Sequence, residues 1–137
     1  MGHDEIRPLT GTAFDYWGGL GMMVAESADT LHILGLEKEF AEATEYIRSS
    51  MHFNLNHYTS FFETNIRMVG GLLSGYALSN NRVYMEKAKD LGDRLMKAYK
   101  TSDVFNRPNV NLATGEGSIA EKRISLAEIA TNYLEFV

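Results

Sequence analysis

The chain has 137 residues, with 13 basic and 18 acidic side chains and a formal net charge of −5, and this length suits a single domain. The basic side chains form no long cluster, so we expect no nucleic-acid partner. The absence of cysteine excludes disulfides, thiol catalysis and cysteine-bound zinc. No apolar run is long enough to span a membrane, and the start MGHDEIRP lacks the apolar stretch of a secretory signal.

The first half of the chain shows the hydrophobic period of two helices. One helix is predicted over 20–34, where Gly35 follows as a left-handed cap. A second is predicted over 37–51, because acidic residues open it and Arg48 lies near its end, as the helix dipole favours. The segment 52–60 mixes polar and aromatic residues and is predicted to be extended.

A third helix is predicted over 61–79, with an apolar stripe formed by Phe62, Ile66, Val69, Leu73 and the pair Tyr76/Ala77. Small residues thin its middle, and each Gly weakens a helix by up to about 1 kcal/mol relative to Ala. We therefore expect a neighbouring helix to approach this helix closely at Gly70, Gly71, Ser74 and Gly75.

The second half of the chain predicts a fourth helix over 83–99, a loop over 101–117 and a last helix from Ser125 that still runs at Val137. In the fourth helix we expect buried Leu91, Leu95, Ala98 and Tyr99, and the exposed ion pairs Asp90/Arg94 and Asp93/Lys97. No strand is predicted firmly. Successive helix hairpins favour an all-α fold of the bundle, solenoid or α/α-toroid kind.

Acidic residues within apolar helices are the candidates for chemistry, namely Glu26, Asp29, Glu63 and Glu128. The simplest interpretation of Ser60–Glu63 and Ser125–Glu128 is structural, because both spell the S-x-x-E capping box. The functional interpretation starts from the same fact. If successive helix starts face one end of a toroid, these carboxylates meet there, and glycoside hydrolysis requires a pair of carboxylates.

Other side chains leave alternatives open. Arg67 lies one helical turn after Glu63, where it either forms an ordinary intrahelical ion pair or also binds a sugar hydroxyl. The four histidines form no metal-binding pattern. Trp17 and its neighbouring aromatic residues suit either stacking on a sugar or packing at a helix entrance. No nucleophile elbow or phosphate-binding loop is present.

Six separated blocks follow one another in the order found in a known family. They are GHDEIRPL at 2–9, ADTLHILGLEKEFAEA at 28–43, FETNIRMVGGLLSGYALS at 62–79, KAKDLGDRLMKAY at 87–99, VNLATG at 110–115 and LAEIATNYLEF at 126–136. With these blocks the chain resembles the class I α-1,2-mannosidases, glycoside hydrolase family 47. The resemblance implies part of an (α/α)7 barrel, truncated, with residues 1–137 as the N-terminal portion of one catalytic domain that is incomplete at both ends.

The resemblance also implies an activity: inverting hydrolysis of terminal α-1,2-linked mannose on N-linked high-mannose glycans, in the lumen of the endoplasmic reticulum or Golgi. Glu63 would be the general acid, acting through a water. Arg67, Asp29 and Glu128 would contact the sugar. The family binds Ca²⁺ deep in the barrel, and its calcium-ligating threonine and its general base would both lie beyond Val137. We therefore expect the isolated chain to be marginally stable and nearly inactive.

The chain departs from the family pattern before the VN block. The segment 105–109 replaces the usual I-P-Y-S-x, which affects one expected sugar contact. One alternative is a non-catalytic glycan-recognition protein like the family members that enhance degradation in the endoplasmic reticulum. Another is a helical interaction protein that keeps the family residues for packing.

Overall fold

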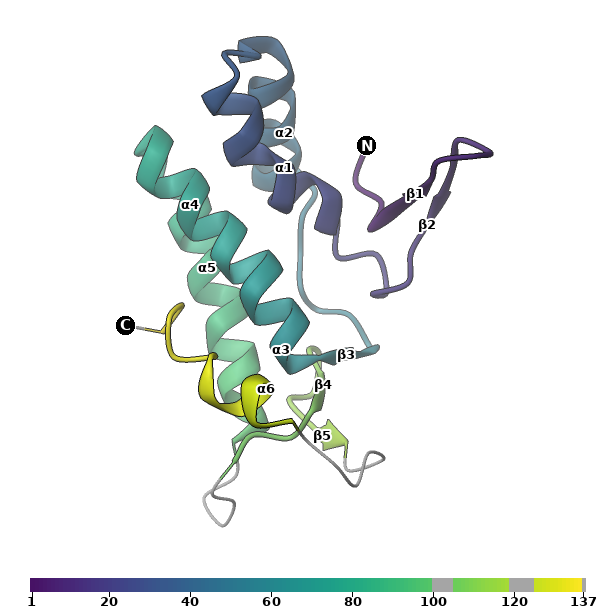
Figure 1. Cartoon of the computed structure of the whole chain (residues 1–137), viewed down its shortest axis with the longest axis vertical. Coiled ribbons are helices and arrows are strands. Elements are labelled where there is room, and N and C mark those ends of the chain that lie inside the picture. Colours follow the sequence, from purple (N-terminus) through teal and green to yellow (C-terminus); the bar gives the residue numbers. More distant parts are fainter. Residues whose placement is uncertain (100–104, 119–124, 137) are drawn as a thin grey trace.

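Two helix hairpins form the framework of the chain in the computed structural model, which describes residues 1–99, 105–118 and 125–136 (Figure 1). The first pairs α1 (Met22–Ile33) with α2 (Glu37–Ser49), and the second pairs α4 (Gly70–Ser79) with α5 (Arg82–Leu95). Helix α4 packs on α1, and α5 packs on both α4 and α2. This arrangement confirms the predicted all-α fold built from successive helix hairpins.

The helix predicted over 61–79 is continuous but changes its winding. It begins as α3 (Phe61–Glu63), passes through a π-helical turn η1 (Thr64–Val69) and continues as α4. The predicted apolar stripe is confirmed in part: Val69 is buried, and Leu73 and Tyr76 pack against the core. It is wrong at Ile66 and Ala77, which are exposed. A different face points into the core and carries Phe61, Asn65, Met68, Leu72 and Gly75.

Helix α1 turns mainly small and medium-sized side chains into the core. Its buried residues are Met22, Val24, Ala25 and Ala28, whereas Met23 is 42% exposed. Small side chains suit this face because α4 comes very close: a Cβ atom added at Gly71 would lie 2.7 Å from the carbonyl oxygen of Ala25. The expected close approach of a helix to the glycine-rich stretch is thereby confirmed.

Helix α5 ends at Leu95 and a 3₁₀ turn, η2 (Met96–Ala98), follows it. Leu91, Leu95 and Ala98 are buried as predicted, whereas Tyr99 is 38% exposed. The expected Asp90/Arg94 ion pair forms at 2.9 Å. The expected Asp93/Lys97 pair is wrong: Asp93 pairs with Lys89 at 2.6 Å, because Lys97 lies in the 3₁₀ turn and packs over Gly115.

Two small antiparallel sheets were not predicted. A hairpin joins β1 (Glu5–Arg7) to β2 (Thr12–Phe14), and a second sheet has the order β3 (Tyr58–Ser60), β4 (Asn109–Asn111), β5 (Gly117–Ser118). The extended segment before residue 61 is confirmed by β3. The predicted loop is wrong at β4 and β5, and its residues 101–104 lie outside the described part of the chain.

The last helix is shorter than predicted, since α6 (Leu126–Ala130) ends well before residue 136. Side-chain amides bind backbone carbonyl groups at the end of α6. The Asn132 side-chain amide donates to the Glu128 carbonyl at 2.6 Å, and the backbone carbonyl of Asn132 accepts from Asn65 Nδ2 at 3.2 Å. The chain then turns so that Phe136 stacks near Phe61, with ring centroids 6.4 Å apart.

No helix within the described residues combines the length and apolar character needed to cross a bilayer. The core is one cluster that the two helix hairpins share with the chain segments that connect them. Its largest fully buried side chains are Tyr84, Phe53, Phe61, Leu20, Met22 and Ile47.

Candidate active site

Glu63 and Arg67 form the centre of the candidate site, at the point where β3 leads into the π-helical turn. Ser60 ends β3 and caps the helix, since its Oγ accepts a hydrogen bond from the Glu63 backbone N–H at 3.3 Å. Only this half of the predicted capping box forms. The Glu63 carboxylate turns instead to Arg67, whose Nε donates to Glu63 Oε2 at 2.7 Å.

Glu26 on α1 is a second carboxylate beside Arg67. Its Oε1 lies 3.8 Å from Arg67 Nε, and the side chains of Glu26, Arg67 and Glu63 are 39%, 39% and 32% exposed. Burial raises the pKa of the Glu26 carboxyl, Arg67 opposes part of that rise, and the negative charges of Glu63 and Glu5 add to it. Arg67 therefore lies between two carboxylates.

Trp17 completes the surroundings of Arg67. The guanidinium carbon lies 6.0 Å from the centre of the Trp17 ring, at the outer limit of a cation–π contact. We call Glu26, Glu63, Arg67 and Trp17 the Arg67 cluster. Its members come from the loop before α1, from α1 itself, from α3 and from the π-helical turn, so packing of the helices brings them together.

Asp29 lies on the same side of the molecule. Its Oδ2 accepts from Ser74 Oγ at 2.8 Å, and its Oδ1 accepts from the Thr30 backbone N–H at 2.6 Å. Asp29, Glu26 and Arg67 line a depression of about 280 Å³ between α1 and the 61–79 helix. Three of the four residues predicted for the site, Glu63, Arg67 and Asp29, are thus grouped around one arginine and the depression beside it.

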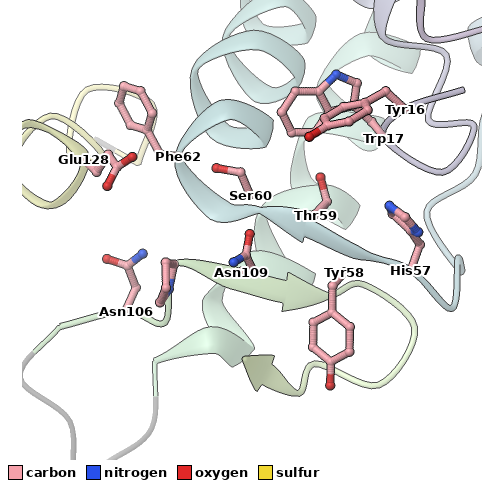
Figure 2. A pocket seen from close by; sticks show the side chains of 11 residues that line it. Tyr16, Trp17, His57, Tyr58, Thr59, Ser60, Phe62, Asn106, Asn109 and Glu128 are labelled. Atoms are coloured by element: carbon pink, nitrogen blue, oxygen red, sulfur yellow. The ribbon is translucent and has the colours of Figure 1, made fainter. Parts of the chain in front are cut away.

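Glu128 lies instead in a neighbouring pocket of about 380 Å³ (Figure 2). There the simple structural interpretation is confirmed: Glu128 Oε2 accepts from the Ser125 N–H at 3.1 Å and Ser125 Oγ accepts from the Glu128 N–H at 3.2 Å, which is a complete capping box. Glu128 nevertheless faces the pocket, together with the aromatic side chains Tyr16, Trp17, His57, Tyr58 and Phe62. We call this cavity the aromatic pocket.

Trp17 connects the two parts of the site, because it lines the aromatic pocket and also faces Arg67. Figure 2 shows Trp17 and Tyr16 on one side of the pocket, with Phe62 and Glu128 on another. Phe62 directly precedes Glu63 in the chain. The predicted acidic residues therefore do not share a single cavity. Asp29 lines the depression and Glu128 lines the aromatic pocket. Glu63 is linked to the depression through its bond to Arg67.

Sequence reasoning gave one site residue no role and missed another. Glu26 was among the acidic candidates, and its position three residues before Asp29 was the available signal that the two share a helix face. Asn106 gave no such signal. It is 3% exposed, it lines the aromatic pocket, and its Oδ1 has no hydrogen-bond partner within the described residues.

A metal ion is usually held by several acidic or histidine side chains that converge on one point. Among residues 1–99, 105–118 and 125–136, no three His, Asp or Glu side chains converge in a way that could hold a metal ion. Calcium coordinates six to eight oxygen atoms. The acidic side chains of the described residues therefore do not by themselves form a calcium site.

Curated relatives of this chain are α-1,2-mannosidases. A mannosyl-oligosaccharide 1,2-alpha-mannosidase from Arabidopsis thaliana is 41% identical over 140 residues, which cover 99% of this chain and 25% of that protein. The endoplasmic reticulum mannosyl-oligosaccharide 1,2-alpha-mannosidase of Homo sapiens is 39% identical over 137 residues, which cover 98% of this chain and 20% of that protein. The chain thus spans a quarter or less of the length of these relatives.

A solved structure of an alpha-1,2-mannosidase has the same fold over most of this chain. The alpha-1,2-mannosidase from Trichoderma reesei superposes with a TM-score of 0.73 at 26% identity, over 82% of this chain and 26% of that chain. This match confirms that the helix hairpins form part of an (α/α)7 barrel. The family model of glycosyl hydrolase family 47 matches residues 1–137. The chain therefore belongs to glycosyl hydrolase family 47.

Proposed function

We propose that this chain contributes the acid-bearing part of an α-1,2-mannosidase, which hydrolyses terminal α-1,2-linked mannose of N-linked high-mannose glycans with inversion. The observation that carries the proposal is the short Glu63–Arg67 pair beside the aromatic pocket. The names of the relatives support the reaction, since they are mannosyl-oligosaccharide 1,2-alpha-mannosidases.

Glu63 is proposed as the general acid. Arg67 holds Oε2, and no hydrogen bond within the described residues reaches Oε1. Oε1 is therefore the atom that delivers a proton to the departing glycosidic oxygen, directly or through one water. Fixing one oxygen while leaving the other free orients the carboxyl group without blocking it. The carboxylate that activates water is expected from another part of the family domain, because a carboxylate pair must flank the bond.

The sugar-binding contacts are assigned to both cavities. Arg67 and Asp29 present a guanidinium and a carboxylate to hydroxyl groups at the smaller depression. In the aromatic pocket, Trp17 and Phe62 offer apolar ring surface to a sugar face, while Glu128 accepts from a hydroxyl. The Oδ1 of Asn106 has no hydrogen-bond partner among the described residues, which supports a hydroxyl-bearing ligand there, because a buried acceptor without a partner costs about 1–3 kcal/mol.

Calcium and cellular location extend the proposal. A Ca²⁺ ion would supply positive charge and coordination to sugar hydroxyl groups, with ligands from outside the residues described here. A secretory-pathway location is supported by the relatives that are called endoplasmic reticulum mannosidases. The low activity expected of the isolated chain stays a prediction, and a comparison of its turnover with that of the full-length protein tests it.

The acid role is tested by Glu63→Gln in the full-length protein, with Glu86→Gln on the exposed face of α5 as the matched control. We expect turnover of α-1,2-mannobiose to fall about 10²–10⁴-fold in the first variant only, because general acid catalysis contributes that much. Unchanged turnover removes Glu63 from the mechanism. Proton NMR of the first product formed reads the stereochemistry, and release of α-mannose contradicts inversion.

A further inference from the structure

A buried carboxylate lies behind the aromatic pocket and takes no direct part in it. Asp4 is 1% exposed, and four backbone N–H groups donate to it. Its Oδ2 accepts from Trp17 at 2.9 Å and from Gly19 at 2.8 Å. Its Oδ1 accepts from Gly21 at 2.9 Å and from Met22 at 3.4 Å. Hydrogen bonds to a charged acceptor are stronger than neutral ones, so Asp4 fixes the whole segment that leads into α1.

The segment has a backbone shape that few sequences allow. Gly18 has φ +84° and Gly21 has φ +74°, a region that side chains rarely adopt. A Cβ atom at Gly18 would lie 2.8 Å from the ring of His57, which lines the aromatic pocket. The segment therefore wraps around Asp4 on one side and presses against a pocket residue on the other.

Trp17 is the residue through which this segment reaches the site. The backbone N–H of Trp17 donates a hydrogen bond to Asp4, while its indole ring lines the aromatic pocket and faces Arg67. Figure 2 shows the indole beside Tyr16, above the β3 strand that carries Thr59. The position of one ring thus depends on a carboxylate that does not touch the pocket.

We propose that Asp4 is a positioning residue: its carboxylate accepts from four backbone N–H groups between residues 17 and 22 and thereby holds Trp17 as the wall shared by the aromatic pocket and Arg67. The expected effect of Asp4 on mannoside binding rests on the proposed function. The expected effect of Asp4 on the position of Trp17 does not depend on the proposed function.

The first test uses fluorescence, because Trp17 is the only tryptophan of the chain. Asp4→Asn keeps the shape of the side chain but replaces one acceptor oxygen by a donor, so two of the four N–H groups lose their partner. We expect the emission to move to longer wavelength and quenching by acrylamide to increase, with the helical circular dichroism unchanged. Asp93→Asn on the exposed face of α5 is the matched control and should leave the emission as in the wild type.

The second test measures steady-state kinetics of the full-length protein with α-1,2-mannobiose. Asp4→Asn should raise KM about three- to tenfold, the equivalent of one lost aromatic contact. It should leave kcat within about twofold, because the 2.7 Å bond between Glu63 and Arg67 is made within one helix and keeps both of its partners. Unchanged KM in a variant whose Trp17 emission has moved overturns the link to the sugar. Absence of turnover in the wild type would contradict the proposed function and leave the fluorescence test intact.

A third measurement needs no variant. In hydrogen exchange of the wild-type chain, the amides of Trp17, Gly19 and Gly21 are expected to be protected as strongly as those inside α1. Rapid exchange at these amides, or unchanged emission in Asp4→Asn, overturns the proposal. A variant that loses its helices overturns it too, since Asp4 would then support the whole fold and not one wall of the pocket.

Discussion

The contact between α1 and α4 can be tested by a single added methyl group. Gly71→Ala places a Cβ 2.7 Å from the carbonyl oxygen and 3.1 Å from the carbonyl carbon of Ala25. Both are backbone atoms and cannot rotate away, so α4 must shift by roughly 0.5–1 Å to restore an ordinary separation. The neighbouring Gly70 is the matched control, because its nearest atoms would lie 3.9 Å from the new methyl group.

The magnitudes follow from two opposing effects. Overpacking typically costs about 1–3 kcal/mol, and Ala favours a helix over Gly by up to about 1 kcal/mol. Gly71→Ala should therefore lower the free energy of unfolding by about 0.5–2 kcal/mol, or Tm by about 2–8 °C. Gly70 already has helical backbone angles, and a Cβ atom there would make no contact closer than 3.9 Å, so Gly70→Ala should raise Tm slightly. Thermal unfolding followed by far-UV circular dichroism measures both. A Gly71→Ala chain as stable as Gly70→Ala would refute the close approach of the two helices.

Three further substitutions test the charges and the cap. Because the pKa of the Glu26 carboxyl is raised, protonation of this group stabilises the fold below the ordinary pKa of a glutamate, and this stabilisation is lost as pH rises through the pKa of the folded state. Glu26→Gln should thus raise Tm near pH 7, with the gain vanishing when Tm is compared near pH 4. Ser125→Ala removes the α6 cap and should lower the free energy of unfolding by about 1 kcal/mol in a denaturant titration. Glu128→Gln retains the capping box, since Gln serves there as Glu does, so Tm should hold while KM for α-1,2-mannobiose rises; an unchanged KM excludes Glu128 from sugar binding.

The positions of the helices could be predicted because their signals are local. Gly35 follows the end of α1 in the left-handed conformation, with φ +68°, as its place in the sequence indicated. The buried face of α5 followed its apolar pattern. The buried faces of α1 and of the 61–79 helix were only partly predictable, because the pattern gives weight to large apolar side chains. Here the contact between α1 and α4 is made by Ala25, Ala28 and Gly71, which a count of large apolar residues overlooks.

The strands escaped prediction because their partners are distant in the sequence. Tyr58 pairs with Asn111, more than fifty residues later, and β4 consists of two asparagines around one valine. The side chain of Asn111 shapes the turn that follows, since its Oδ1 accepts from the N–H groups of Ala113 and Thr114. A polar triplet of this kind resembles a loop until its partner strand is known.

The two S-x-x-E motifs show why one part of the site was predictable and another was not. Glu63 and Glu128 occupy the same third position after a capping serine, yet only Glu128 reaches back to its cap. The difference lies four residues further on, where Glu63 has Arg67 and Glu128 has Asn132. A charge-assisted bond from a guanidinium is about twice as strong as one from a neutral backbone N–H. Arg67 therefore draws the Glu63 carboxylate away from the cap, whereas Asn132 donates to the Glu128 carbonyl and leaves that carboxylate in place. The neighbours Glu26 and Trp17 reach Arg67 only when α1 packs on the 61–79 helix, so no spacing along the chain could have indicated them.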